Sequence, residues 1–305
     1  MKLKQLPEDF YVKELMDSNF VSSGDYSCFS LRKNGWGTLA AIFAIANCLK
    51  APVKAFGIAG MKDKRAVTEQ YVSVYRISRE QIEKVKIKDV GLNFLGYLKD
   101  RILLGDHKGN HFRIVARDFD ERKEIKHGKI LNLYDYQRFG KKGENIGLGR
   151  ALIKGDYKTF CDGFNLKVEN NDYIGAIRRI NRRVLRFIIS SYQSHLWNGV
   201  ARKLVNEYEQ IPVLGFLTEF GGEIKDAYCR LMKEEGISKE DFLMKKIPEL
   251  SSEGGTRKVF VELSNLSWKW DEDEVNKGKF KCILEFDLGK GQYATHVVKS
   301  LFSES

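Results

Sequence analysis

Stretches in which apolar and polar residues alternate predict β-strands over much of the chain. They lie at 8–14, 26–31, 54–58, 67–75, 101–104, 111–116, 280–288 and 293–298. Two stretches have helical spacing instead: 38–50, for which Thr38 is the expected N-cap, and 178–204. Residues 212–266 show weaker periodicity and are rich in glycine and acidic residues. Because strands lie on both sides of a long and different stretch, the pattern predicts one mixed-sheet domain interrupted by an insertion.

The composition is that of a basic, globular chain. Its 305 residues allow two domains, and 43% of them are hydrophobic. Lysine and arginine (52) exceed aspartate and glutamate (41), which gives a net charge of +11. An excess of this size is typical of proteins that bind a polyanion, with nucleic acid as the first candidate, and the alternative is a merely basic surface.

Several kinds of site have no support in the sequence. The five cysteines are widely spaced and never form CxxC, which argues against a disulfide framework and a cysteine-based zinc site. The chain has no P-loop, HExxH or GxSxG motif and its histidines are scattered, so we expect no metal and no small-molecule cofactor. His195 is interpreted as a core or rim residue. The glycine-rich run 140–149 lacks GxGxxG spacing and is interpreted as a plain loop.

The sequence also has no membrane or export signal. The amino terminus lacks an apolar signal core, and the apolar run 39–49 is too short to span a bilayer. We therefore expect a cytoplasmic protein that does not enter a membrane.

Residues 56–70, FGIAGMKDKRAVTEQ, place one carboxylate, Asp63, directly after a predicted strand. Lys62, Lys64 and Arg65 surround it in the sequence, and opposite charges nearby favour the ionised form of a carboxylate. Such a group can act as a nucleophile or a general base. The alternative is an ordinary solvated loop of mixed charge.

Two further segments combine aromatic and polar residues. In 132–140, NLYDYQRFG, the aromatic side chains can stack on an unstacked base, and Arg138 can bind phosphate or pair with a carboxylate. In 288–298, LGKGQYATHVV, a Gly-Lys-Gly turn presents Tyr293. The alternatives are a strand edge with core aromatics for the first segment and a hairpin turn beside a buried strand for the second.

Taken in order, these three segments resemble the motifs GxKDKxAxTxQ, NYFGxQRFG and LPxGSYAT of the TruD family of tRNA pseudouridine synthases. The matching residues of the first motif are Gly60, Lys62, Asp63, Lys64, Ala66, Val67, Thr68 and Gln70. The family's amino-terminal pattern KxxPEDFxVxE is matched by Lys4, Pro7, Glu8, Asp9, Phe10, Val12 and Glu14. Residues 186–198 are similar to a family helix that ends in AYQSxLFN, so the resemblance spans almost the whole chain.

The second segment departs from the family pattern at two positions. Tyr134 stands where the family has Phe, and Asp135 stands where it has Gly. Tyrosine keeps a stacking face and adds a hydroxyl, whereas aspartate adds a negative charge and gives up a glycine backbone. Either a local turn or the substrate preference has changed. The insertion, at roughly 100 residues, is also short for the family, which implies a weaker grip on RNA or a different RNA target.

For the fold, the resemblance implies an α+β protein with a mixed, mainly antiparallel sheet flanked by helices, as in other pseudouridine synthases. It implies a discontinuous catalytic domain at 1–157 and 267–305. An inserted α/β TRUD domain is expected at 158–266.

For function, the resemblance implies isomerisation of a uridine in tRNA, with uridine 13 as the expected target, and no cofactor or metal. Asp63 is the expected catalytic carboxylate; whether it attacks the sugar C1′, attacks the base or takes a proton from C2′ stays open. Lys4 is expected to pair with Asp63 and orient it. The expected substrate-binding residues are Tyr293, stacked on the target base, Asn132 and Tyr134 in the pocket wall, and Arg138, which contacts the RNA backbone or forms a structural pair.

Two other functions remain open at this stage. A catalytically altered family member would bind RNA without modifying it, and the changed second segment is compatible with that role. A different RNA-modifying enzyme, such as a methyltransferase, would need a glycine-rich cofactor loop after its first strand, and the sequence has none there.

Overall fold

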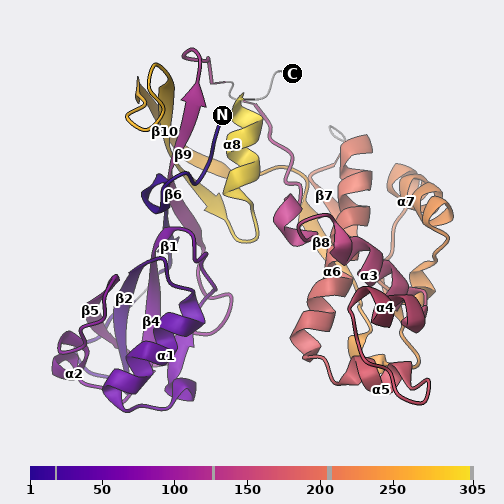
Figure 1. Ribbon diagram of the computed structural model, residues 1–305, viewed down its shortest axis with the longest axis horizontal. Coiled ribbons are helices and arrows are strands. Elements are labelled where there is room, and N and C mark those ends of the chain that lie inside the picture. Colours follow the sequence, from indigo (N-terminus) through magenta and orange to yellow (C-terminus); the bar gives the residue numbers. More distant parts are fainter. Residues whose placement is uncertain (18, 126–127, 205–207, 303–305) are drawn as a thin grey trace. The chain divides into compact units, whose positions relative to one another are not determined.

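The computed structural model describes all residues except 18, 126–127, 205–207 and 303–305. The chain forms two compact units (Figure 1). The first unit comprises residues 1–127 and 262–305, and the second comprises 128–261. The second unit is therefore inserted in the sequence of the first.

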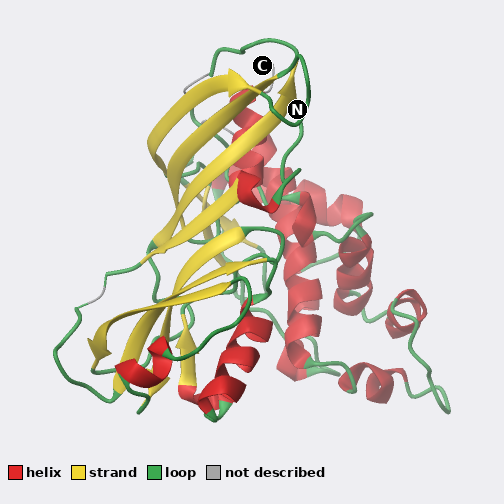
Figure 2. Cartoon of the chain, turned by 60° about the vertical axis from the view of Figure 1, so that its left-hand side comes forward, coloured by secondary structure: helices red, strands yellow, loops and turns green. Residues whose placement is uncertain are grey.

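The first unit is built on an eight-stranded sheet with the order β5-β2-β4-β1-β6-β10-β9, in which β3 pairs with β4. The strands are β1 (Phe10–Leu15), β2 (Tyr26–Asn34), β3 (Phe56–Ile58), β4 (Val67–Tyr75), β5 (Val90–Leu98), β6 (Gly109–Phe119), β9 (Leu263–Glu272) and β10 (Phe280–Gly289). β1 and β4 are parallel, and the other pairs are antiparallel. Figure 2 shows the strong twist of this sheet. The predicted mixed, mainly antiparallel sheet is confirmed.

Helices pack on this sheet. They are α1 (Thr38–Leu49), α2 (Arg79–Glu83) and α8 (Ala294–Phe302), with short 3₁₀ turns at Pro7–Asp9 and Val53–Ala55. Ile42 and Ile45 of α1 share one buried cluster with Phe29 and Val72 of the sheet. Burying this apolar stripe provides the main stabilisation of α1.

The second unit is mainly helical, with a two-stranded antiparallel sheet. Its elements are α3 (Glu144–Ile153), α4 (Tyr157–Gly163), α5 (Tyr173–Arg178), α6 (Arg182–Lys203), β7 (Gln210–Val213), α7 (Gly222–Glu235) and β8 (Gly255–Lys258), with 3₁₀ turns at Tyr136–Arg138, Lys239–Phe242 and Pro248–Leu250. The long helix α6 contributes Tyr192, Leu196 and Trp197 to the core, and all three are fully buried.

The borders of the units differ from the predicted domain borders. They lie after residues 127 and 261, whereas the sequence placed them after 157 and 266. Residues 128–157 belong to the second unit because α3 packs closely on α6. A Cβ atom at Gly149 would lie 2.7 Å from the Ile188 carbonyl oxygen and 2.7 Å from Tyr192 Cβ, so only glycine allows this approach. Residues 18, 126–127, 205–207 and 303–305 fall within the predicted domains but outside the described residues.

Two predicted strands are wrong. Residues 293–298 are not a strand: helix α8 begins at Ala294, because Val297, Val298 and Leu301 form a buried face at helical spacing. Residues 101–104 are irregular, because the Ile102 N–H donates to Ser73 Oγ, at 3.0 Å, instead of a neighbouring strand.

Two local predictions also need correction. Thr38 is the first residue of α1 and Gly37 is its N-cap, so the threonine hydroxyl is free for another partner. The run 140–149 is not a plain loop, since α3 begins at Glu144. The carboxylate of Glu144, the first residue of α3, accepts hydrogen bonds from the backbone N–H groups of Lys141 and Lys142, at 3.2 and 2.7 Å. These bonds stabilise the turn that leads into the helix.

The sequence pattern missed β5 and β9, the two ends of the sheet order. Gly91 and Gly96 interrupt the alternation of β5, and most residues of β9 are partly or fully exposed. An edge strand buries fewer side chains, so its periodicity is weaker. No helix among the described residues is long and apolar enough to cross a bilayer.

Candidate functional site

Asp63 lies in the loop between β3 and β4. Lys33 of β2 donates a hydrogen bond to the backbone of that loop. The Lys33 Nζ donates to the carbonyl oxygens of Trp36, at 2.6 Å, and Asp63, at 2.9 Å. Lys33 is only 1% exposed. Burial, followed by the charge of Lys62, lowers the pKa of Lys33 to about 8, although Asp63 acts in the opposite direction. A buried cation therefore fixes the main chain at the residue that carries the candidate carboxylate.

A second set of buried contacts fixes the start of the same loop. The backbone N–H of Lys62 donates to Thr38 Oγ1 at 2.9 Å, and this hydroxyl donates to Gln70 Oε1 at 2.9 Å. The Gln70 Nε2 in turn donates to the Gly60 carbonyl oxygen at 3.0 Å. The threonine that the sequence suggested as a helix cap thus connects α1, β4 and the loop.

Lys4 forms an ion pair with Asp63. Its Nζ lies 2.5 Å from Asp63 Oδ2 and 4.2 Å from the centroid of the Phe10 ring. The Lys4 side chain is 17% exposed and the Asp63 side chain 50% exposed. The ammonium is thus held between an aromatic face and the carboxylate, while the carboxylate stays accessible to a substrate.

The segment that carries Lys4 is itself fixed to the sheet. Lys4 has φ +57°, a conformation that non-glycine residues adopt rarely and keep only where their surroundings hold them. Lys2 exchanges two backbone hydrogen bonds with Arg117 of β6, at 2.8 and 2.9 Å. The buried Arg117 guanidinium also pairs with Asp9 and Asp273, each at 2.8 Å. These contacts position the Lys4 ammonium before any substrate arrives.

A buried ion pair connects the same two segments a second time. Lys62 Nζ lies 2.6 Å from Glu14 Oε1, with side-chain exposures of 6% and 0%. The other Glu14 oxygen accepts the backbone N–H of Tyr71 at 3.1 Å, so the buried carboxylate is well satisfied. The amino-terminal motif and the KDK motif therefore contact each other through two lysine–carboxylate pairs, Lys4–Asp63 and Glu14–Lys62.

Tyr293 is half-buried at the start of α8, in the same unit as Asp63. Its carbonyl oxygen accepts the N–H groups of His296 and Val297, each at 3.0 Å, so the residue begins the helix. Gly291 precedes it with φ +71°, a conformation that favours glycine.

The turn before Tyr293 is connected to the Asp63 loop through one intermediate segment. Lys290 Nζ donates to the Gly105 carbonyl oxygen at 2.7 Å, and the Gly105 N–H donates to the Ala59 carbonyl oxygen at 2.8 Å. Ala59 lies four residues before Asp63 in the sequence. The structure thus brings the segments of Lys4, Asp63 and Tyr293 together in the first unit.

Asn132 belongs to the second unit, where its side chain holds strand β8. Its Oδ1 accepts a hydrogen bond from Arg257 Nη2 at 2.6 Å, and its Nδ2 donates to the Lys258 carbonyl oxygen at 3.1 Å. The residue is 3% exposed. Its amide therefore supports the local structure directly.

Tyr134 is anchored on α6 by Asn198. The Asn198 amide accepts from the Tyr134 N–H at 2.9 Å and donates to the Tyr134 carbonyl oxygen at 3.0 Å. The Tyr134 ring meets Trp197 edge-on, with centroids 5.7 Å apart, and the Arg257 guanidinium carbon lies 3.9 Å from its centroid. The backbone and the ring of Tyr134 are thereby both held by neighbours.

Arg138 and Asp135 form hydrogen bonds that fix the conformation of the segment 132–140. Arg138 donates from Nε to Ser194 Oγ and from Nη2 to Ser190 Oγ, each at 3.0 Å. Asp135 has φ −81°, and its carboxylate accepts the Tyr136 N–H at 2.7 Å as the cap of a 3₁₀ turn. Aspartate in place of the family's glycine therefore fits this backbone without strain.

The Asn198 anchor gives a stability prediction. We expect Asn198→Ala to lower the free energy of unfolding by about 2 kcal/mol, because two backbone groups of Tyr134 lose their partner. Urea denaturation with a tryptophan fluorescence signal measures the change. The exposed Gln137→Ala is the control and should stay within ~0.5 kcal/mol of the unchanged protein. An equal effect of the two substitutions would contradict the anchoring role.

The predicted site residues therefore fall into two groups. Asp63, Lys4 and Tyr293 are in the first unit, whereas Asn132, Tyr134 and Arg138 are in the second. The sequence interpretation gave no positioning role to the residues that fix these groups, although it named Thr38 as a helix cap and Gln70 as a motif residue. These residues are Lys33, Thr38, Gln70, Asn198 and Arg257. Lys33 gave one signal that was available: it follows Phe29 and Leu31 at strand spacing, two residues beyond the predicted strand 26–31.

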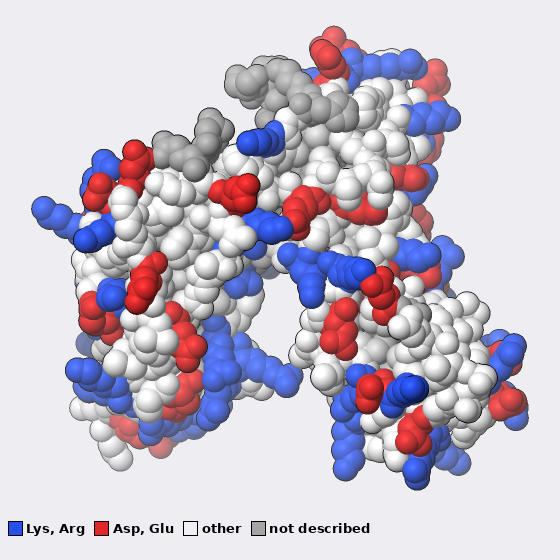
Figure 3. Space-filling view, turned by 180° about the vertical axis from the view of Figure 1, so that it is seen from behind, with Lys and Arg blue, Asp and Glu red and all other residues white. Residues whose placement is uncertain are grey.

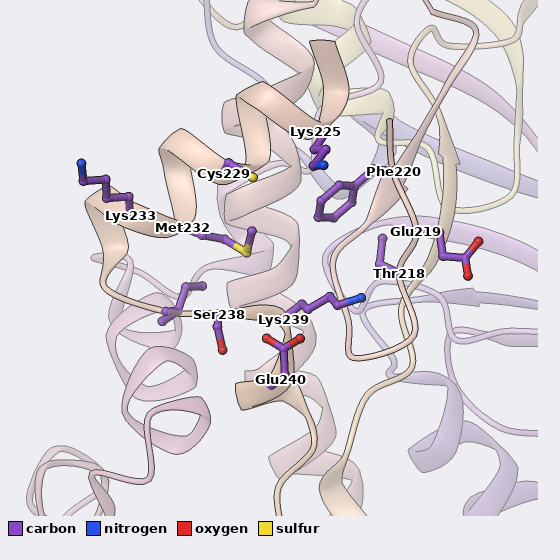
Figure 4. A pocket seen from close by; sticks show the side chains of 11 residues that line it. Thr218, Glu219, Phe220, Lys225, Cys229, Met232, Lys233, Ser238, Lys239 and Glu240 are labelled. Carbon is purple, nitrogen blue, oxygen red and sulfur yellow. The ribbon is translucent and has the colours of Figure 1, made fainter. Parts of the chain in front are cut away.

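A cavity of about 570 Å³ lies elsewhere in the second unit, between α7 and the segments before and after it (Figure 4). The residues that line it are Thr218, Glu219, Phe220, Lys225, Cys229, Met232, Lys233, Ile237, Ser238, Lys239 and Glu240. They include none of the predicted site residues, so this cavity does not locate the candidate chemistry. Among the described residues, no group of three or more His, Cys, Asp or Glu side chains is arranged to hold a metal ion.

Comparison with known families gives one clear match. The family model described as tRNA pseudouridine synthase D (TruD) matches residues 1–165 and 205–301. The stretch 166–204 lies outside the match.

Individual relatives agree with this match. A protein of Methanosarcina mazei named "Probable tRNA pseudouridine synthase D" is 27% identical over 407 aligned positions, which cover 98% of this chain and 92% of the relative. A tRNA pseudouridine synthase D of Aquifex aeolicus is 26% identical over 381 positions, with 99% and 98% coverage. The crystal structure of a TruD protein from Methanosarcina mazei has a TM-score of 0.79 and 25% identity, and covers 98% of this chain and 92% of that one. Both alignments exceed 305 positions, so these relatives contain residues that this chain lacks.

Proposed function

The chain belongs to the tRNA pseudouridine synthase D (TruD) family, and on this premise we propose that it converts a uridine of tRNA to pseudouridine with Asp63 as the catalytic carboxylate. The proposal rests on the contacts and the exposure of Asp63. Its main chain is fixed by the buried Lys33, its carboxylate is paired with Lys4, and half of its side chain remains exposed. A fixed, accessible carboxylate is what a reaction at the sugar or the base requires.

In the proposed reaction the target nucleotide leaves its stack before its ring is reached. The bond between C1′ and N1 breaks, the uracil turns, and a bond between C1′ and C5 forms. The hydrogen on C5 is lost as a proton and N1 gains a proton, so the substrate is neither oxidised nor reduced and no redox cofactor enters the balance. The carboxylate attacks C1′, attacks the base or removes the C2′ proton, and these three routes are distinguished by the intermediate that each forms.

Lys4 is proposed as the residue that orients Asp63. Its charge-assisted hydrogen bond to Oδ2 fixes the direction of the carboxylate, and the Phe10 ring beneath the ammonium fixes the lysine.

Asn132 and Tyr134 are proposed to shape the pocket wall, and Arg138 to contact the RNA backbone. We propose that the first unit is the catalytic domain and that the second is the TRUD insertion. The proposed target is uridine 13 of tRNA. The proposed location of the protein is the cytoplasm.

Tyr293 is proposed to stack on the target base. For Tyr293→Ala we expect an affinity loss of ~1–3 kcal/mol, the usual contribution of one base–aromatic stack. Tyr293→Phe keeps the ring and should retain affinity. Fluorescence anisotropy with a labelled tRNA transcript measures both variants. If the alanine variant matched the unchanged protein in rate and affinity, the stacking role would be rejected.

The reaction itself is tested by tritium release from tRNA transcripts that carry uridine labelled at C5. The proposal expects release that depends on the enzyme, and mapping of pseudouridine in the product identifies the position. Binding of the transcript without release would overturn the proposed activity and favour a family member that binds RNA without modifying it.

A further inference from the structure

Five arginines lie within nine residues, 178–186 (RRINRRVLR), without an acidic residue between them. They are Arg178, Arg179, Arg182, Arg183 and Arg186, and all five are exposed. The run joins the end of α5 to the start of α6 and falls in the stretch 166–204 that the family model does not match. Figure 3 shows Lys and Arg side chains gathered over this end of the second unit.

The start of α6 borders an open groove of about 500 Å³. It is lined by Arg183, Arg186, Phe187, Ile189, Ser190, Gln193, Leu250, Ser251, Ser252, Glu253 and Gly254. Phe187 is 41% exposed, and Val184, one turn earlier on the same helix, is also 41% exposed, so the start of α6 leaves apolar surface uncovered beside the arginines. The Arg138 guanidinium carbon lies 5.4 Å from the centroid of the Phe187 ring and helps to hold it.

The arginine side chains at this groove form few hydrogen bonds and ion pairs with the described part of the protein. Arg186 donates to the Glu249 carbonyl oxygen at 3.2 Å, and the Glu249 carboxylate is taken by Arg178 at 3.3 Å. The Arg183 side chain forms no hydrogen bond or ion pair with the described residues. Glu253 is the one acidic residue among those that line the groove, so two cations face one anion there.

We propose that this groove binds a single-stranded stretch of the RNA substrate, with phosphates at Arg183 and Arg186 and a base stacked on Phe187. Guanidinium groups form paired hydrogen bonds with phosphate, and a half-exposed ring beside them offers a stacking face. Two cations beside one aromatic face match a nucleotide chain, which offers both phosphates and stacking bases, better than they match an acidic protein surface, whose carboxylates do not stack. The identity of the ligand as RNA rests on the proposed function.

The test measures binding in the Asp63→Asn protein, so that turnover cannot change the ligand. The probe is a labelled tRNA transcript. For Arg183→Gln/Arg186→Gln we expect a dissociation constant about tenfold higher, and a slope of log Kd against log salt that is shallower by ~1.4, from about 0.7 per phosphate contact of a single strand. The double variant Arg202→Gln/Lys203→Gln removes the same charge at the other end of α6 and should leave both values unchanged. Glutamine preserves helix propensity, and circular dichroism confirms folding.

The stacking half of the proposal has its own variants. Phe187→Ala should raise the dissociation constant by about fivefold or more, whereas Phe187→Tyr should retain the affinity. Equal affinities of the groove and control variants would overturn the groove as an RNA site, even if the unchanged protein forms pseudouridine. Absence of pseudouridine formation together with the expected binding losses would overturn the proposed activity and leave the groove in place.

Discussion

Asp63→Asn is expected to reduce pseudouridine formation by at least about four orders of magnitude, as removal of a central catalytic group commonly does. The amide has nearly the same shape as the carboxylate, so the buried contacts of the loop with Lys33 and Thr38 remain. What the variant loses is the negative charge and the lone pair that attacks the substrate or takes a proton. Tritium release from labelled tRNA measures the rate, and fluorescence anisotropy should give an affinity within about threefold of the unchanged protein.

The control for this substitution is Asp25→Asn. Asp25 is an exposed carboxylate of the same unit and pairs with Arg76 at 3.4 Å, so the change removes the same charge from a surface ion pair. A surface pair contributes little, and the rate should be unchanged. Measurable pseudouridine formation by Asp63→Asn, above the background of RNA without enzyme, would refute the assignment of Asp63.

The elements that the sequence predicted best have a strong local signal. Strand β4 (Val67–Tyr75) is rich in β-branched and aromatic residues, and the helix α1 (Thr38–Leu49) is signalled by its apolar run, although Leu39 and Phe43 are exposed and only one face of α1 is buried. Residues 293–298 gave a misleading signal, because a run of six residues with valines fits both a strand and one turn of a helix. Only the burial of Leu301 beyond the run shows the helical face, and that depends on packing.

The candidate site was predictable only to the extent that it is local. The sequence places Asp63 between lysines, but Lys4 lies 59 positions away and entered through the resemblance alone. The contacts of Lys33 with the Asp63 carbonyl and of Asn198 with Tyr134 join residues that are 30 and 64 positions apart. No periodicity or composition encodes such pairs, because they arise from how strands and helices pack.

The buried lysine gives the second large effect. We expect Lys33→Met to reduce the rate of pseudouridine formation by about 100-fold, because the Asp63 main chain loses its fixed position and a displacement of ~1 Å at a reacting group has a cost of this size. The exposed strand residue Lys13→Met is the control and should leave the rate unchanged. A rate for Lys33→Met equal to that of the control would show that Asp63 does not depend on this contact.

The pH dependence separates a positioning role from a merely structural one. Since the pKa of Lys33 is lowered to about 8, the amine of the folded protein loses its proton as the pH rises through that value. The neutral amine has two N–H groups in place of three, and it no longer contacts the carbonyls of Trp36 and Asp63 as a cation. The rate of the unchanged protein should therefore fall as the pH rises through about 8, and this fall should be absent from the residual activity of Lys33→Met.

Stability should change with pH in the opposite sense. Between pH 8 and the ordinary lysine value near 10.5, the unfolded chain still binds a proton that the folded chain has released, so the contribution of Lys33 to the free energy of unfolding rises with pH. Below pH 8 the full cost of a charged, buried amine is present. Urea denaturation of the unchanged protein and of Lys33→Met at pH 7 and pH 9.5 measures the difference. If stability and rate both fell together above pH 8, general unfolding, and not the loss of the Lys33 contact with Asp63, would explain the alkaline loss of activity.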